Sequence, residues 1–478
     1  MKSKEVTIIG AGPAGLGAAL ELQKNNIKDI LIIDMHSKSG GLSRTEIFEG
    51  NRFDLGPHRF YSKNNEINQL WHEILGNDFK PVKRCTRIYY KNKFFDYPLK
   101  PFNTLKNLGL IESSQAMIDY FISQIKNSKN SIQSFEDWVC KQFGRKLYRT
   151  FFKTYTEKVW GIDCKNISAD WAAQRIKGLN LYEAVLDALK PAKNNKSAKT
   201  LVKEFDYPVY GAGMMYERMA EQISAQGGEF LFDTTVKQIN VKDGRVESIL
   251  TNNNHRELII PIETLFSSMP LTKLIQKIKP EVREGVLKAS RELFFRDHIT
   301  VNLIIDGYDL FPDHWIYVHS PEVKMGRMAN YNNFSPYMSA KQNKTILSVE
   351  YFVFQNDNIW NMPDKEIIEL AKKELNDMNL VDKNSVENGL VIRETDSYPI
   401  YFIDYKKYYH IVKEYISDIS NIQCIGRGGM YKYNNQDHSL YTGMLSARNY
   451  CGASYNIWDV NVDAEYHENA PKYEKELK

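Results

Sequence analysis

A glycine motif at the start of the chain constrains the fold more than any other feature of the sequence. Gly10, Gly12 and Gly15 form a GxGxxG pattern between the apolar run "VTII" and the amphipathic stretch "AGLGAALELQKN". Asp34 closes the next apolar run, "ILIID". Between a strand and a helix, such glycines let backbone amides approach a pyrophosphate, and the following acid accepts hydrogen bonds from a ribose. The motif therefore predicts a dinucleotide-binding α/β fold, with flavin and nicotinamide cofactors both still open.

Composition narrows the class of protein. A chain of 478 residues should form two or three folding units. The 63 basic and 59 acidic residues leave a net charge of only +4, so neither a nucleic-acid partner nor a disordered chain is expected. The five cysteines are scattered and form no CxxC pair, which argues against a disulfide framework and a zinc site and favours a cytoplasmic protein without a metal. No apolar run reaches about 18 residues, so no membrane span is expected, and the glycines mark the N-terminal segment as folded protein rather than a leader.

Hydrophobic periodicity divides the rest of the chain. From about Pro98 to Leu189 the pattern is helical, and Ser134 with Asp137 forms a capping box. The low-complexity stretch "KPAKNNKSAKT" that follows predicts an exposed loop. The alternating stretch "VKQINVKDGRVESI", centred on Asp243 and Gly244, is typical of a β-hairpin. Alternating runs between residues 298 and 354, with the helical run "PDKEIIELAKKELNDM", predict a largely antiparallel sheet that would carry the substrate.

A second glycine pair follows the acid at the end of the second strand. The segment "GGLSRTEIFEGNRFDLG" begins at Gly40 and resembles FAD enzymes of the amine-oxidase and glutathione-reductase type. Near the C-terminus, "GRGGMYKYNNQDHS" crowds phenols, amides and Asp437 before a predicted helix. The electropositive N-terminus of that helix would stabilise an anionic reduced flavin. In the simpler alternative, Asp437 only caps a structural helix.

The predicted fold class is therefore α/β, with a Rossmann-like FAD-binding domain of the glutathione-reductase/amine-oxidase type. We expect a helical insertion and an antiparallel β-sheet substrate domain beside it. The expected ranges are 1–80, 205–270 and 400–465 for a discontinuous FAD-binding domain, 98–200 for the helical domain, 81–97 and 271–399 for the sheet, and 466–478 for a charged tail.

Several segments, taken in order, resemble the UDP-galactopyranose mutases, especially the longer eukaryotic kind. They are "GGLSRTEIFEGNRFDLGPHRF", "FEDWVCKQFGRKLYRTFFKTYTEKVWGI", "WAAQRI", "HWIYV", "GRMANYNNFSPY", "SYPIY" and "GRGGMYKYNNQDHS". The resemblance implies an isomerase that interconverts the pyranose and furanose forms of a nucleotide sugar. It also implies that FAD must be reduced, since its N5 acts as a covalent nucleophile at the anomeric carbon. NADPH or NADH would supply the electrons.

The resemblance also assigns roles to particular residues. Arg175 and Arg327 match arginines that grip the diphosphate, a group that suits the planar guanidinium fork. Tyr398 and Tyr433 match tyrosines that bind the same group. The other expected catalytic or substrate-binding residues are His58 beside the flavin, Asn435, Tyr155, Trp160, Trp315 and Tyr317. The expected FAD-binding residues are Gly10, Gly12, Pro13, Ala14, Gly15, Asp34, Gly41, Leu42, Arg44, Gly56, His58, Val236, Gly426, Arg427, Asn435 and Asp437.

Two positions depart from the family pattern where it recognises uracil. Thr156 stands in place of an asparagine, and Lys100 stands in place of a glutamine. Both replaced groups are amides suited to the edge of a uracil ring. We therefore expect a different nucleotide sugar, such as a dTDP-, GDP- or CDP-linked deoxyhexose, bound near these two residues.

Two other functions fit the same cofactor motifs. One is an FAD-dependent oxidoreductase of the amine-oxidase or protoporphyrinogen-oxidase type, which would need an apolar substrate tunnel. The other is a catalytically silent flavoprotein that acts as a scaffold, in which the two phosphate-binding arginines would be missing. The sequence contains both arginines and favours the mutase. It leaves the oligomeric state open, and a homo-oligomer is compatible with it.

Overall fold

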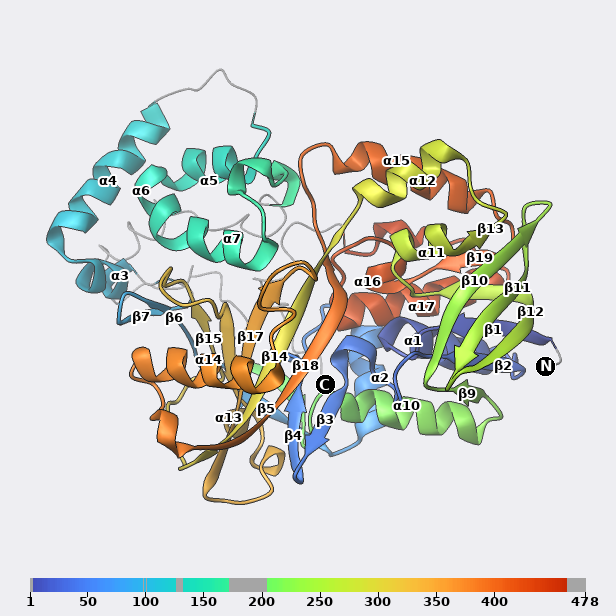
Figure 1. Cartoon of the computed structure of the whole chain (residues 1–478), viewed down its shortest axis with the longest axis horizontal. Coiled ribbons are helices and arrows are strands. Elements are labelled where there is room, and N and C mark those ends of the chain that lie inside the picture. The colour runs from blue at the N-terminus through green and yellow to red at the C-terminus, as the bar shows by residue number, and fades with distance from the viewer. Residues whose placement is uncertain (1–2, 98, 100, 126–131, 172–203, 462–478) are drawn as a thin grey trace, which may run out of the picture.

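The structure is a computed structural model that describes residues 3–97, 99, 101–125, 132–171 and 204–461. Three parts lie side by side in Figure 1: a nucleotide-binding part around β1 and α1, a sheet that contains β14 to β18, and a cluster of helices from α3 to α7. Among the described residues, no helix is both long enough and apolar enough to cross a bilayer.

The parallel strands of the nucleotide-binding part are buried, as their apolar sequences require. β1 lies between β2 and β12, and β9 and β19 extend the two sides. The bounds are β1 (Lys4–Ile9), β2 (Ile30–Ile33), β9 (Glu229–Leu231), β12 (Arg256–Ser267) and β19 (Ile422–Cys424). Helix α1 leaves the sheet directly after β1 and packs against two later helices. These helices are α1 (Pro13–Lys24), α10 (Gly213–Ala225) and α17 (Gln436–Tyr450).

The predicted hairpin extends the same sheet. β10 (Thr234–Lys242) and β11 (Arg245–Asn253) pair in antiparallel fashion, and the two residues between them, Asp243 and Gly244, both have positive φ. This is the geometry that an Asp-Gly turn provides. The strand β13 (Ile278–Lys279) lies on the outer side of β10.

The segment from residue 271 to 293 belongs to the nucleotide-binding part, whereas we expected it in the substrate sheet. Its helices α11 (Leu271–Lys277) and α12 (Glu284–Glu292) bury Leu274 and Val286 in the core that also contains Ile239. They pack with α15 (Tyr405–Ser417) over the hairpin. Apolar burial against this core therefore decides the position of the segment.

The second sheet is antiparallel except for one pair, β6 and β15, which run parallel. Its strands in spatial order are β18 (Val386–Pro399), β14 (Phe295–Asp306), β17 (Lys344–Val353), β16 (Arg327–Asn330), β15 (Trp315–Val318), β6 (Thr86–Tyr90) and β7 (Lys93–Asp96). Helix α14 (Asp364–Asp377) covers one face and packs on β18 and β14. The predicted largely antiparallel sheet and the helix predicted within this part of the sequence are confirmed.

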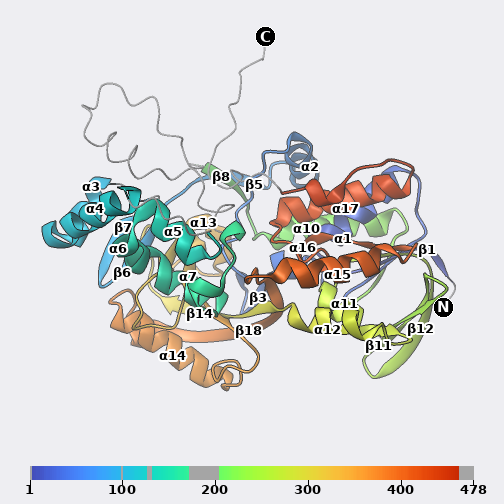
Figure 2. The ribbon, with the colours of Figure 1, turned by 90° about the horizontal axis from the view of Figure 1, so that it is seen from above.

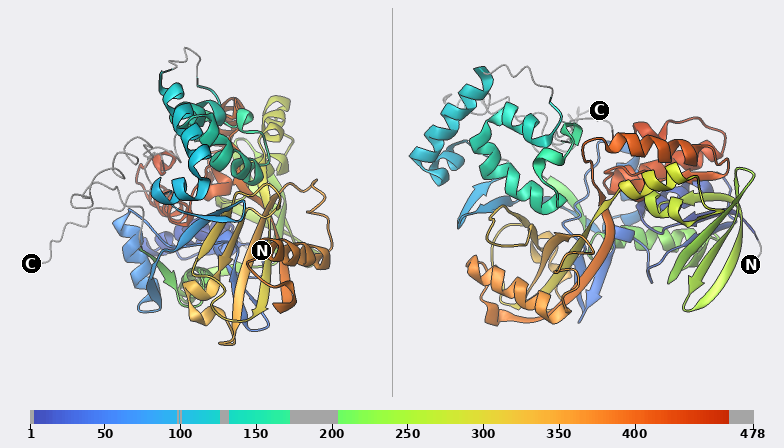
Figure 3. Two further views of the ribbon diagram at one scale, coloured as in Figure 1. Left: turned by 90° about the vertical axis from the view of Figure 1, so that its left-hand side faces the viewer. Right: turned by 45° about the horizontal axis from the view of Figure 1, so that its top comes forward.

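The helical cluster sits above one end of this sheet in both views of Figure 3, and Figure 2 shows its separation from α1, α10 and α17. It contains α3 (Pro101–Leu108), α4 (Leu110–Ile125), α5 (Phe135–Phe143), α6 (Arg145–Leu147), a π-helical segment (Tyr148–Lys153) and α7 (Thr154–Trp160). The predicted Ser134–Asp137 capping box begins α5. Lys158 attaches α7 to the sheet, because its Nζ donates to the carbonyl oxygens of Val318, Ser320 and Met325 at 3.2, 2.6 and 3.1 Å.

Short elements connect the three parts. They are β3 (Thr45–Phe48), β4 (Asn51–Asp54), α2 (Asn65–Leu75), β5 (Phe79–Lys83), β8 (Glu204–Pro208) and α13 (Tyr331–Phe334). At their centre the fully buried carboxylate of Asp54 accepts hydrogen bonds from the hydroxyls of Thr45 and Tyr207, both at 2.5 Å. Tyr331 Oη donates to the backbone carbonyl of Asp54 at 2.6 Å. This network fixes the segment after β4, which enters the candidate site.

Candidate cofactor and substrate site

A cavity of about 1100 Å³ is lined by the glycine turn after β1, by strands of the second sheet, and by the segment that leads into α17. Most of the residues that the sequence singled out line it. They are Gly10, Gly12, Pro13, Ala14, Asp34, Gly41, Leu42, His58, Val236, Tyr317, Arg327, Tyr398, Gly426, Arg427, Tyr433, Asn435 and Asp437. One cavity thus joins the predicted cofactor and substrate residues.

The remaining predicted residues lie elsewhere. The described residues that do not line the cavity are Gly15, Arg44, Gly56, Tyr155, Thr156, Trp160 and Trp315. Lys100 and Arg175 lie outside the described residues, so their expected contacts stay predictions.

The turn after β1 is a cradle that side chains would fill. Gly10 has a φ of +105°, and a Cβ there would lie 2.0 Å from Ser268 Oγ. A Cβ on Gly15 would lie 1.9 Å from the carbonyl oxygen of Gly10, so glycine is required for α1 to pack this closely. Gly12 is the N-cap of α1 and supplies no side-chain cap. The first amides of α1 are therefore left to a ligand, which fits a pyrophosphate.

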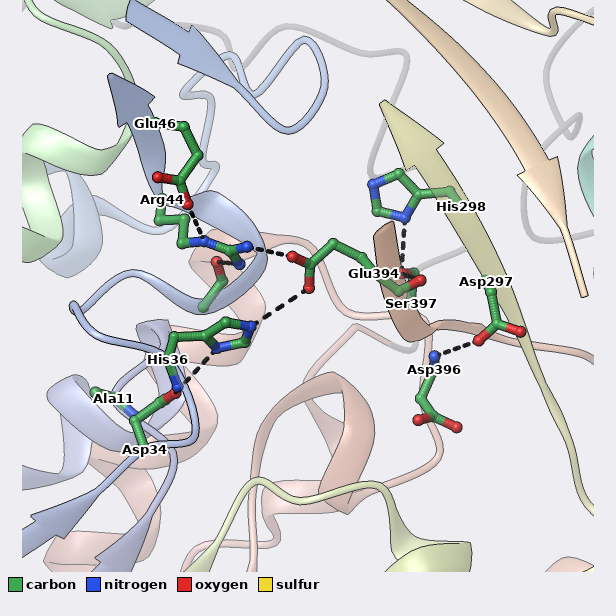
Figure 4. Close-up of polar contacts among 11 residues, drawn as sticks. Ala11, Asp34, His36, Arg44, Glu46, Asp297, His298, Glu394, Asp396 and Ser397 are labelled. Atoms are coloured by element: carbon green, nitrogen blue, oxygen red, sulfur yellow. Dashed lines mark hydrogen bonds and ion pairs between the residues drawn. The ribbon is translucent and has the colours of Figure 1, made fainter. Parts of the chain in front are cut away.

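Asp34 is tied to the glycine turn (Figure 4). Its Oδ2 accepts a hydrogen bond from the backbone N–H of Ala11 at 2.7 Å, and its Oδ1 lies 3.0 Å from His36 Nδ1. His36 Nε2 is 3.7 Å from Glu394 Oε2 on β18. An acid at the end of β2 thus connects the nucleotide-binding part to the second sheet through one imidazole.

Arg44 belongs to the same cluster and does not line the cavity. Its Nε donates to Glu46 Oε1 at 2.6 Å, and its Nη2 is ion-paired with Glu394. Side chains of both Arg44 and Glu394 are buried. The sequence motif assigned Arg44 to FAD, whereas in the structure its guanidinium holds β18 against β3. His36 and Glu394 were missed, because no local pattern links two residues so far apart in the chain.

The N-terminus of α17 is capped by Asn435 and not by Asp437. The side chain of Asn435 accepts from the His438 backbone N–H, and the Asn435 N–H lies 3.3 Å from His438 Nδ1. Asp437 is the second residue of the helix and is 2% exposed; burial raises its pKa to about 7. Gln436, between them, donates from Nε2 to the carbonyl oxygen of Arg59 at 2.9 Å. The start of α17 therefore positions the segment that carries His58 and Arg59.

Arg327 is paired with an acid that the sequence analysis missed. Its Nε and Nη2 lie 2.6 and 2.5 Å from the two oxygens of Glu350, directly opposite on β17. Glu350 is fully buried, and a Cβ on Gly56 would lie 3.4 Å from both partners. Glycine at residue 56, with a φ of +139°, thus leaves room for the ion pair. The charge of Arg327 is balanced within the protein before any ligand binds.

Arg427 has a different environment. Its Cζ lies 5.1 Å from the ring centre of Tyr398 and 5.0 Å from that of Tyr433. Its Nε and Nη1 donate to the carbonyl oxygens of Asn434 and Ser397, at 2.7 and 3.1 Å. No carboxylate in the described chain pairs with this guanidinium. Its positive charge therefore stays available to an anion beside the two phenols.

Two buried histidines complete this end of the cavity. Burial, together with Arg427 and Arg327, lowers the pKa of His58 to about 3, and burial lowers the pKa of His298 to about 4. Both rings are therefore neutral at pH 7. His298 Nδ1 lies 2.7 Å from Ser397 Oγ, whereas the buried Nδ1 of His58 has no hydrogen-bond partner in the described part of the chain. A buried nitrogen without a partner is suited to a hydrogen bond with a ligand.

Aromatic side chains form the wall between the sheet and the helices. Tyr155 stacks on His319 with ring centres 4.5 Å apart and meets Tyr317 edge-on at 5.6 Å. The ring centres of Trp160 and Tyr433 are 5.8 Å apart. Thr156, one residue after Tyr155, is buried. Burial raises the pKa of Tyr155 well above its usual value, so its hydroxyl stays protonated.

Known proteins share this architecture. Residues 8–74 match the NAD(P)-binding Rossmann-like domain family. The chain is 29% identical over 168 residues to dTDP-fucopyranose mutase of Escherichia coli, across 34% of this chain and 44% of that protein. A crystal structure of reduced UDP-galactopyranose mutase superposes with a TM-score of 0.83 at 19% identity, over 97% of this chain and 98% of that one. The chain has the fold of a UDP-galactopyranose mutase.

The predicted fold class, a Rossmann-like domain with a helical insertion and a largely antiparallel sheet, is therefore confirmed, as is the resemblance to the mutases. The match to the Escherichia coli mutase spans less than half of that protein's length. A proposed protoporphyrinogen oxidase from Exiguobacterium sp. 255-15 has a related fold, with a TM-score of 0.70 at 15% identity over 94% of this chain and 99% of that one. Mutases and oxidoreductases share this fold, so the side chains of the cavity must distinguish them.

Proposed function

We propose that this protein is an FAD-dependent nucleotide-sugar mutase that interconverts pyranose and furanose forms of its substrate. The observation that carries the proposal is Arg427, a cation without a carboxylate partner in the described chain, which lies beside Tyr398 and Tyr433. Among the described residues that line the cavity, eight lysines and arginines face four carboxylates. Such a cavity suits a diphosphate and does not suit an apolar substrate.

FAD fits a second group of residues that line the cavity. The cradle of Gly10, Gly12 and Gly41 would accept its pyrophosphate, Asp34 its ribose, and the buried Nδ1 of His58 a polar edge of its ring. When bound in its reduced form, FAD would supply a nucleophilic N5 for the anomeric carbon. We propose NADPH or NADH as the source of electrons and, from the free thiols, the cytoplasm as the compartment.

The side chains of the cavity would hold the diphosphate while it is detached from the sugar. Arg427 would balance its charge, and the hydroxyls of Tyr398 and Tyr433 would donate hydrogen bonds to phosphate oxygens. Arg327 would present its remaining nitrogen, Nη1, in an orientation fixed by Glu350. Because these groups are already in place, little reorganisation accompanies the growth of charge on the leaving group.

For the substrate, we propose a dTDP-linked deoxyhexose. Thr156 and Lys100 replace the amides expected for uracil, and the similar Escherichia coli protein is named for dTDP-fucopyranose. Reduced protein incubated with a panel of nucleotide sugars should convert such a substrate to its furanose isomer, resolved by chromatography. Conversion should stop when FAD is oxidised. Equal conversion by oxidised protein would contradict the proposed role of the cofactor.

An FAD-dependent oxidoreductase is the second candidate, because its fold is related. Such an enzyme would bleach its flavin on adding substrate and reoxidise in air. A mutase would instead bind nucleoside diphosphates without net oxidation of the sugar. Flavin absorbance recorded during anaerobic titration with dTDP-fucopyranose separates these two outcomes.

A further inference from the structure

Two further arginines of the cavity converge on one tryptophan of the second sheet. Arg59 follows His58, and Arg84 lies between β5 and β6; both line the cavity. The guanidinium carbon of Arg59 is 5.5 Å from the ring centre of Trp315, and that of Arg84 is 5.4 Å from the same ring. The guanidinium carbon of Arg84 also lies 5.1 Å from the ring centre of Tyr97.

This cluster contains buried donors without acceptors. Arg59 Nη1, Arg84 Nε and Trp315 Nε1 are all buried and have no hydrogen-bond partner among the residues that the structure describes. Trp315 itself is 2% exposed. Each of these atoms can only donate a hydrogen bond. A ligand that satisfied the cluster would therefore have to offer acceptors.

The charge of the cluster is also unbalanced. Arg327 faces Glu350, Arg393 faces Asp364, and Lys273 faces Asp396. Within the described chain, neither Arg59 nor Arg84 forms an ion pair. Burial and the charge of Arg84 lower the pKa of Arg59 to about 10, which still leaves the Arg59 guanidinium charged at pH 7. Two neighbouring cations without an anion are costly, and a bound anion would remove that cost.

We propose that Arg59 and Arg84, stacked at Trp315, form an anion subsite for the phosphates of the nucleotide ligand. The inference rests on the proposed function in so far as a nucleotide diphosphate enters the cavity. Here the guanidinium groups that line the cavity would hold the phosphate oxygens, while the rings of Trp315 and Tyr97 would hold the guanidinium planes. Arg427 and the two tyrosines would then contact the sugar-side phosphate, and the arginine pair the nucleoside-side phosphate.

Direct binding to the folded flavoprotein tests this subsite without any need for turnover. Isothermal titration would compare inorganic pyrophosphate, dTDP and uncharged thymidine on the wild type and on Arg59→Gln and Arg84→Gln. Each substitution should weaken pyrophosphate and dTDP about tenfold or more, the usual effect of losing a charged hydrogen bond, and leave thymidine unchanged. Arg393→Gln is the matched control, because Arg393 lines the same cavity but its guanidinium already pairs with Asp364, and the variant should keep wild-type affinity.

Arg59→Lys and Arg84→Lys guard against a folding defect, since each keeps the charge and should retain part of the affinity. Flavin content and thermal unfolding would show that the variants are folded. Wild-type affinity for pyrophosphate and dTDP in both glutamine variants would overturn the inference. If dTDP binds through Arg59 and Arg84 but no nucleotide sugar is isomerised, the subsite stands and the proposed function fails. If a nucleotide sugar is isomerised but the dTDP affinity of both variants is unchanged, the proposed function stands and the subsite fails.

Discussion

The two ends of the cavity are built in different ways. At the nucleotide end, backbone atoms and missing side chains form the site: glycines pack so closely that a single Cβ would collide. At the sheet end, charged and aromatic side chains form it, and Arg327 depends on Glu350, a partner on another strand. Substitution of these glycines should therefore disrupt the whole nucleotide end. At the sheet end, by contrast, each substituted side chain should change only its own contact.

The largest expected effect is at the nucleotide end. Gly15→Val would place a branched side chain where a Cβ alone would lie 1.9 Å from the carbonyl oxygen of Gly10. We expect nearly complete loss of bound FAD, measured as flavin absorbance of the purified protein. Gly285→Ala on α12 is the control, because nothing lies within 4 Å of a Cβ there. Normal flavin content in Gly15→Val would refute the contrast between the two ends.

The second effect concerns the buried ion pair at the sheet end. Glu350→Gln leaves the guanidinium of Arg327 without its counter-charge, so we expect the free energy of unfolding to fall by about 3 kcal/mol or more. Denaturant titration measures this loss. In Glu387→Gln the broken pair with Lys344 is half exposed, and the expected change is below about 1 kcal/mol. Equal losses in both variants would show that burial of Glu350 does not matter.

The third effect concerns Asp54, on the segment between the two ends. Burial raises its pKa to about 6, above the value of about 3.9 expected in the unfolded chain. The folded protein therefore holds this proton more tightly, and its stability relative to Asp54→Asn should rise as pH falls from about 6 to about 4. The gain should approach about 1.4 kcal/mol per pH unit within that window and vanish above it. A constant difference between the two proteins from pH 4 to 7 would contradict the shifted pKa.

The smallest effect is the loss of one hydroxyl. Tyr433→Phe keeps the ring beside Arg427 but removes a proposed donor to the diphosphate, so kcat/KM should fall about tenfold while FAD stays bound. Steady-state kinetics with the preferred nucleotide sugar measures the change. Tyr408→Phe, on α15, should match the wild type. An unchanged kcat/KM in Tyr433→Phe would remove this residue from the site.

The difference between the ends also explains what the sequence could predict. The GxGxxG turn, the Asp-Gly hairpin and the capping box at Ser134 are local, so neighbouring residues suffice to identify them. The partner of Arg327 depends on strand register: Glu350 lies opposite it on β17, and nothing in "LSVEYF" reveals that pairing. The ion pair of Arg44 could not be predicted for the same reason, since its buried partner Glu394 comes from a distant strand.

Burial explains the remaining differences between the predictions from sequence and the structure. The segment 271–293 has helical and apolar residues that fit either part, and its contacts with the hairpin core place it with the nucleotide-binding part. Arg59 and Arg84 carried no signal in sequence, because a surface arginine and a buried one look alike until their surroundings are known. Structure was needed to show that both lack a counter-charge within the described chain.

The central claim is that the diphosphate leaves the anomeric carbon inside this cavity and then returns. Positional isotope exchange tests it most directly, with a heavy oxygen isotope placed in the bridge between the sugar and the diphosphate. During turnover by reduced protein, the label should scramble into the non-bridging oxygens of the adjacent phosphate, and Arg427→Gln should slow this exchange. A label that stays in the bridge while the pyranose and furanose forms interconvert would contradict the account.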